Sequence, residues 1–198
     1  MSKGDETRAR ILRHASGVAS RDGLGGLSIG ELAAQLGMSK SGLFAHFGSK
    51  EDLQLEVLRA SAADFAERVI RPSLKEARGA PRLRALFERW LKWASDPDAP
   101  GGCIFAGASF ELDDQPGPVR EFLVEEEKRL LDVLSRSARL GVESGLLRKD
   151  LDCDLLAFQL HGLMLGFHHA WRLMRQRNAD ALARRSFEQL LAQALPAH

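Results

Sequence analysis

The sequence has no tyrosine, only two cysteines and no long apolar run. Cys103 and Cys153 form neither a Cys-x-x-Cys pair nor the dense pattern of a disulfide scaffold, which indicates a reduced compartment. No stretch reaches the roughly 18 uninterrupted apolar residues of a membrane-spanning helix, and the nearest, Leu155–Met174, is interrupted by polar side chains. The first residues also lack the apolar core of a secretory signal. We therefore expect a cytoplasmic protein that does not enter the membrane.

Alternating runs of Val, Ile and Thr are missing too, so little in the sequence favours a β-sheet. Ala, Leu, Arg and Glu dominate, and Gly and Pro fall between periodic segments. The net charge of +1 excludes a uniformly basic nucleic-acid coat but not a locally basic face. The 198 residues suit one domain, or a small module joined to a larger one. These features predict an all-α protein of about nine helices.

Apolar periodicity and helix-breaking residues predict where these helices lie. The first three are expected at about Thr7–Arg21, Ile29–Leu36 and Ser39–Phe47. Ser28-x-x-Glu31 has the form of a capping box before the second helix, and Ser39 can cap the third. The later helices are expected at about 50–70, 81–95, 104–112, 118–142, 152–174 and 179–194.

The segment Ser28–Phe47 has the spacing of a helix-turn-helix. Gly37 joins its two short helices, because glycine allows the left-handed backbone of a tight turn. In such a motif the second helix lies in the major groove of DNA. The sequence therefore predicts an N-terminal three-helix DNA-binding module.

The distribution of charge supports DNA binding. Thr7–Arg21 contains four arginines and no acid, and Met38–Lys50 contains Lys40, His46 and Lys50 without an acid. Lys50 opens a helix, so its ammonium and the helix N-terminus could both hold a phosphate. The predicted DNA-contacting residues are Ser28, Ser39, Lys40, Ser41, Gly42, Phe44, His46 and Lys50.

Three stretches, Thr7–Ala15, Leu32–Lys40 and Leu43–Leu53, resemble the tetracycline-repressor (TetR/AcrR) family of bacterial transcriptional regulators. The resemblance implies a homodimer with an N-terminal DNA-binding module and a divergent ligand-binding body. Two positions depart from the family pattern. Phe44 replaces the usual Tyr and so lacks a hydroxyl for a phosphate, and Gly42 replaces Thr or Ser, which leaves more of the base readout to Lys40.

With this resemblance, residues 5–64 are predicted to form the DNA-binding domain and residues 65–198 an effector-binding and dimerisation domain. The segment Leu155–Met174 is apolar around nearly its whole circumference, and the last helix carries one apolar stripe. Both are expected in a two-fold four-helix interface. The predicted interface residues are Gly162, Gly166, Ala183, Phe187, Leu190, Leu191 and Ala194.

Aromatic residues concentrate in the middle helices, which suits an apolar effector site with a few polar groups. The predicted pocket residues are Phe65, Trp90, Trp93, Cys103, Phe105, Phe110, Phe122, Phe158, His161, Met164 and His168. His161 and His168 share a helix face, but no carboxylate or cysteine stands at tight spacing to them, so neither a metal nor a cofactor is expected. The acidic stretch Glu111–Glu127 is expected to be a solvated face away from the DNA.

These patterns favour a transcriptional repressor that a small hydrophobic effector releases from a palindromic operator; whether bound protein represses or activates is set by promoter geometry. One alternative is a regulator controlled by a protein partner, or by oxidation of Cys103 or Cys153. Another is an all-helical enzyme, but the sequence has no HExxH, GxSxG, Walker-type or Glu-x-x-His motif.

Overall fold

The computed structural model describes residues 3–97, 99 and 101–196, and throughout them the regular secondary structure is helical, with no strand. The predicted all-α class is confirmed. None of the helices in this described part combines the length and hydropathy that a membrane crossing requires.

The first helices form as their sequence signals predict. They are α1 (Lys3–Asp22), α2 (Ile29–Gln35), α3 (Lys40–Phe47) and α4 (Lys50–Phe65). The later elements are α6 (Ala80–Ala94), α7 (Ile104–Glu111), α8 (Pro118–Glu143), α9 (Cys153–His168) and α10 (Ala179–Ala194).

Two predicted long helices change their winding before they end. After α4 the chain forms a π-helical turn, η1 (Ala66–Ile70), and then the short α5 (Arg71–Leu74). Pro72 has no N–H to donate to the preceding turn, which is where the helix widens. The second π-helical segment, η2 (His169–Leu173), follows α9.

The chain forms two compact units. Unit 1 combines Met1–Asp64 with Asp96–Glu125, and unit 2 combines Phe65–Ser95 with Glu126–His198. Thus α7 and the beginning of α8, which lie within the predicted C-terminal domain of residues 65–198, cluster with the N-terminal helices.

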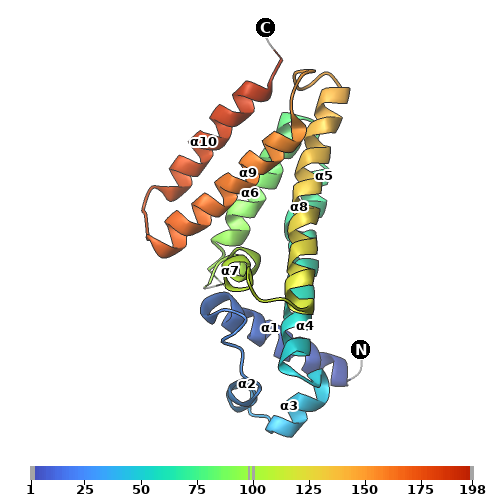
Figure 1. Cartoon of the computed structure of the whole chain (residues 1–198), viewed down its shortest axis with the longest axis vertical. Helices are drawn as coiled ribbons and strands as arrows, with labels where there is room; N and C mark the ends of the chain where they lie inside the picture. The colour runs from blue at the N-terminus through green and yellow to red at the C-terminus, as the bar shows by residue number, and fades with distance from the viewer. Residues whose placement is uncertain (1–2, 98, 100, 197–198) are drawn as a thin grey trace. The chain divides into compact units, whose positions relative to one another are not determined.

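In unit 1, α1 to α4 lie next to one another (Figure 1), and their buried apolar side chains contribute to its core. Ile11, Ala15 and Ala19 are the buried stripe predicted for α1. Leu32 and Leu43, from the two short helices, are also fully buried. This packing fixes α2 and α3 relative to α1.

In unit 2, α10 lies along α9, and α6 packs against α9 as well (Figure 1). Helices α6 and α10 also contact each other, because the ring of Phe87 on α6 stacks on that of Phe187 on α10, with centroids 4.4 Å apart and planes 9° apart. Leu160 and Met164 of α9 are buried in the same core. The stripe of α10 is therefore packed within its own protomer.

Candidate nucleic-acid interface

Serine caps begin the two helices of the helix-turn-helix. Ser28 Oγ accepts the N–H of Glu31 at 3.4 Å, and Ser39 Oγ accepts the N–H of Gly42 at 3.0 Å. These bonds satisfy donors that a helix N-terminus leaves unpaired. The first turn of α3 is therefore well defined.

The turn between α2 and α3 uses Gly37 as predicted. Its φ of 65° lies in the left-handed region, where a side chain would be strained. The chain then reverses so that the N–H of Met38 donates to the carbonyl of Ala33 at 2.8 Å. Ala33 is only 2% exposed, which suits a small residue where two helices meet. The predicted helix-turn-helix is confirmed.

One side of α3 is buried and the other is open. Leu43 and Phe47 anchor the helix in unit 1. Ser39, Lys40 and Ser41 are exposed at its start, and the Phe44 ring is 49% exposed one turn later. We call these four residues the α3 face. They are the side chains that could enter a groove.

The remaining predicted contacts lie elsewhere or are partly covered. Gly42 is half-buried, and a Cβ there would lie 3.0 Å from the capping Ser39 Oγ, so glycine leaves room for the cap. His46 is half-buried with its ring 6.2 Å from that of Phe47. Ser28 is half-buried at the start of α2. None of these three is presented as openly as the α3 face.

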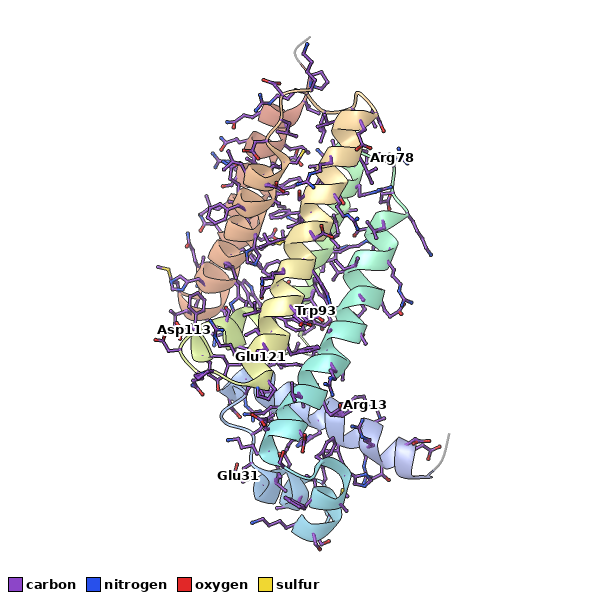
Figure 2. The ribbon with its side chains drawn as sticks, turned by 45° about the vertical axis from the view of Figure 1, so that its right-hand side comes forward. Arg13, Glu31, Arg78, Trp93, Asp113 and Glu121 are labelled. Atoms are coloured by element: carbon purple, nitrogen blue, oxygen red, sulfur yellow. The ribbon has the colours of Figure 1, made fainter. Side chains whose placement is uncertain are left out.

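The arginines of α1 are not equivalent. Arg8 pairs with Glu56 at 2.5 Å and lies over the Phe47 ring, and Arg21 pairs with Asp22. Arg10 and Arg13 are exposed, and Arg13 extends outward from α1 (Figure 2). Arg8 and Arg21 therefore have acids beside them that offset their charge.

Lys50 opens α4, as predicted, but it has a protein partner. Its Nζ donates to the carbonyl of Gly25 at 2.5 Å, across to the turn between α1 and α2. An ammonium has three N–H donors, so this bond leaves others for a phosphate. The phosphate contact stays a prediction, and Lys50 also fastens that turn.

Sequence reasoning missed two further residues at this turn. Gln54 Nε2 donates to the carbonyl of Leu24 at 2.9 Å, and the Glu111 carboxylate accepts the N–H groups of Leu24, at 2.8 Å, and Gly25. The acidic stretch predicts a solvated Glu111, and this is wrong for Glu111, whose carboxylate is bound to the turn. No local signal reveals this contact, because its partners lie 86 and 87 positions away in the sequence.

Two family models match the chain. The model of the tetracyclin repressor-like C-terminal domain matches residues 79–187, more than half of the chain, and that of bacterial regulatory proteins of the tetR family matches residues 11–57. The chain belongs to the TetR family of transcriptional regulators. This family consists of DNA-binding regulators rather than enzymes.

Individual relatives agree with this membership. The transcriptional repressor DhaR of Mycobacterium sp. strain GP1 is 27% identical over 150 residues, which cover 76% of this chain and 74% of DhaR. A TetR regulator from Chloroflexus aurantiacus has a TM-score of 0.88 at 25% identity, with both chains fully covered. A regulator from Saccharomonospora viridis, solved in complex with choline, shares the fold at a TM-score of 0.83 and 24% identity, covering 98% of this chain and 100% of that one.

The predicted pocket residues of this TetR regulator divide between the two units. Cys103, Phe105, Phe110 and Phe122 belong to unit 1, and the others belong to unit 2. Within unit 1, Cys103 and Phe105 are buried, and the half-buried Phe122 ring lies 5.9 Å from the Arg59 guanidinium.

In unit 2, Trp90 and Met164 are buried, and Phe65, Trp93, His161 and His168 are half-buried. Trp93 belongs to α6 and is labelled in Figure 2. Its ring meets the edge of Phe65 at 5.4 Å, and its buried Nε1 has no hydrogen-bond partner among the described residues. His161 Nε2 lies 2.9 Å from a carboxylate oxygen of Glu127. We call these two pairs, Phe65–Trp93 and His161–Glu127, the polar-aromatic set of unit 2.

Two pocket predictions are corrected. Phe110 is 74% exposed and Phe158 is 70% exposed in the protomer, so neither ring lines an enclosed site. Helical periodicity places each ring on a definite side of its helix, but it does not show which side the rest of the fold covers.

The interface prediction also changes. Ala183, Phe187, Leu191 and Ala194 are each 5% exposed or less, because they pack inside their own protomer. They are removed from the predicted set of partner contacts. Gly162 and Gly166 are exposed on α9, and Leu190 is half-buried on α10.

Proposed function

We propose that the protein is a repressor that binds a palindromic operator as a homodimer and leaves it when a small apolar molecule binds unit 2. The observation that carries operator binding is the α3 face, which presents two hydroxyls, an ammonium and an aromatic ring on a capped helix. Such side chains can bond base edges and contact a thymine methyl. A two-fold dimer would place two of these faces in successive major grooves, about 34–36 Å apart.

The dimer contact is assigned to an uncovered side of α9. Leu155 is 52% exposed and Phe158 is 70% exposed, and Gly162 and Gly166 are exposed on the turns that follow. We call these four residues the α9 face. A soluble monomer rarely leaves such an apolar strip open, and the two glycines allow a second helix to approach closely. The occupant we propose is the α9 face of a second copy.

The polar-aromatic set is proposed to recognise the effector. Its rings offer apolar area, and the unpartnered Nε1 of Trp93 offers one oriented donor. The Saccharomonospora viridis regulator was solved with choline, so a body of this fold is able to take up a small molecule. Binding would release the operator if the effector prefers the conformation that fits DNA less well.

The structure offers less support for control by thiol oxidation. Cys103 and Cys153 form no disulfide within the described structure, and both are buried. Burial raises the pKa of the Cys153 thiol, which lowers the fraction of the reactive thiolate at neutral pH. We therefore favour control by an effector over control by oxidation. As a regulator that binds DNA, the protein is proposed to act in the cytoplasm.

Selection from a random DNA library tests operator binding. The wild-type protein should enrich a palindromic sequence, and Lys40→Ala should enrich an altered one. Lys149→Ala is the matched control, because it removes an exposed lysine from the loop between α8 and α9 and should return the wild-type consensus. Failure of the wild-type protein to enrich any duplex at modest ionic strength would refute the proposal.

A thermal-shift screen of hydrophobic and aromatic compounds tests effector binding. A ligand of the folded state raises the melting temperature by mass action, and a true effector must also release the selected operator. Trp93→Phe keeps a ring but removes the indole donor, so it should weaken binding of a compound that accepts this hydrogen bond. An unchanged affinity would remove Trp93 from the effector site.

A further inference from the structure

The turn between α1 and α2 is held from two sides by distant side chains. Its amides, Leu24 N–H and Gly25 N–H, both donate to the Glu111 carboxylate at the end of α7. Its carbonyls accept from α4, where Gln54 Nε2 reaches the oxygen of Leu24 at 2.9 Å and Lys50 Nζ reaches that of Gly25 at 2.5 Å. Leu24 and Gly25 are therefore each bound through both their N–H and their carbonyl oxygen.

A second contact attaches α1 to residues 101–102, which lie just before α7. Ser20 Oγ, near the end of α1, donates to the carbonyl of Gly102 at 3.1 Å. A Cβ on Gly101 would lie 1.4 Å from the Ser20 carbonyl oxygen, so the two backbones touch at this point. The segment that contains α7 is thus attached at both ends. Gly102, before α7, is bound to α1, and Glu111, at the end of α7, is bound to the Leu24–Gly25 turn.

The elements that hold this turn are the ones that continue into unit 2. The chain passes from α4 into unit 2 after Asp64, and residues 96–125 are joined to unit 2 at both of their ends. The two segments of unit 1 that continue into unit 2, α4 and residues 96–125, therefore both contact the Leu24–Gly25 turn within unit 1. The turn leads directly through buried Leu27 to the capped start of α2.

We propose that Glu111 is a positioning residue that couples α7 to the helix-turn-helix, by holding the Leu24–Gly25 turn in the DNA-binding arrangement. A carboxylate that accepts two backbone N–H groups forms charge-assisted bonds, which are stronger than neutral ones. When α7 shifts, these two bonds weaken, and α2 and α3 lose the arrangement that fits the groove. This role rests on the proposed function, because it regulates operator binding.

The sign of the effect separates positioning from simple charge. Removing an acid near a DNA-binding surface should strengthen binding electrostatically, because it reduces repulsion of phosphate. If Glu111 positions the turn, its removal should weaken binding instead. Glu121 on α8 is the matched control, since it is an exposed carboxylate of the same unit (Figure 2).

The test uses the full chain and the duplex selected with wild-type protein. For Glu111→Ala we expect the amide hydrogens of Leu24 and Gly25 to exchange roughly ten- to hundredfold faster. We expect the operator Kd to rise about tenfold, with the salt dependence unchanged because no phosphate contact is lost. Glu111→Gln keeps one acceptor oxygen and should lie between. Glu121→Ala should leave both amides protected and bind the operator as tightly as wild type, or more tightly.

A second variant moves α7 while keeping Glu111. Gly101→Ala forces the segment away from Ser20, so the two amides of the turn should again exchange faster and the operator affinity should fall. Circular dichroism and melting curves show whether either variant has lost its fold. If a folded Glu111→Ala protein keeps wild-type exchange and affinity, Glu111 has no positioning role. If wild-type protein selects no duplex, the proposed function fails, while the exchange measurement still decides whether Glu111 holds the turn.

Discussion

Two phenylalanines of unit 2 give opposite predictions although both lie on apolar helices. Phe187 is 1% exposed and stacks on Phe87, so Phe187→Ala removes core volume from the protomer. Phe158 is 70% exposed on the α9 face, so Phe158→Asp changes the protomer surface. The first variant should affect folding, and the second should affect association.

The magnitudes follow from burial. Truncating a buried Phe to Ala costs about 3–5 kcal/mol, and at about 2–4 °C per kcal/mol for a chain of this size Phe187→Ala should lower the melting temperature by roughly 6–20 °C. Phe158→Asp should change protomer folding by only about 0.5 kcal/mol. Because a two-fold contact buries two copies of Phe158, each worth about 1.5–3 kcal/mol, the dimer Kd should rise by roughly 10²- to 10⁴-fold.

Sedimentation velocity over a concentration series measures the association, and circular dichroism melts measure the folding. Phe158→Asp should sediment as a monomer at concentrations where wild type is dimeric, and its melting temperature should no longer depend on concentration. Phe187→Ala should melt early but sediment as a dimer at low temperature. A dimeric Phe158→Asp protein, or a Phe187→Ala protein that dissociates without losing thermal stability, would refute the assignment of the α9 face.

Three further predictions concern single side chains. Lys50→Ala should weaken binding to all duplexes and lower the slope of log affinity against log salt concentration by about one. Lys40→Ala, which should change base preference, is the comparison. An unchanged slope would mean that Lys50 only fastens the turn. Burial alone would raise the pKa of Glu56, but Arg8 at 2.5 Å and a second arginine outweigh it and hold the pKa below the ordinary 4.5. The stability from this carboxylate is present above the unfolded pKa and is lost as pH falls through the folded one; Glu56→Gln should therefore lose less melting temperature than wild type between about pH 5 and pH 3, and parallel curves would contradict this. Cys153, with its raised pKa, should react with iodoacetamide at pH 7 more slowly than a free thiol, as mass spectrometry would show; rapid labelling would reopen thiol sensing.

Much of the fold was predictable because its signals are local. Ser28 and Ser39 cap helices as expected, and Gly37 provides the left-handed turn. A cap or turn depends on residues three or four positions away, so a short stretch of sequence contains the whole interaction. The helix-turn-helix and its exposed α3 face follow from such stretches.

The sides of the C-terminal helices were not predictable in the same way. Both Phe158 and Phe187 lie on apolar helices, and periodicity alone does not show which stripe the protomer covers and which it leaves open. That choice is made when α6 packs against α9 and α10 lies along it. Only the tertiary structure therefore separated the core stripe from the α9 face.

Glu111 shows the same division between sequence and structure. The sequence determined that an acid stands at the end of α7, within an acidic stretch that is typical of a solvated surface. Only the fold decided that its carboxylate meets the amides of Leu24 and Gly25. A local pattern specifies the conformation of a segment, whereas a contact across more than 80 residues depends on how complete helices pack, which no short stretch of sequence contains.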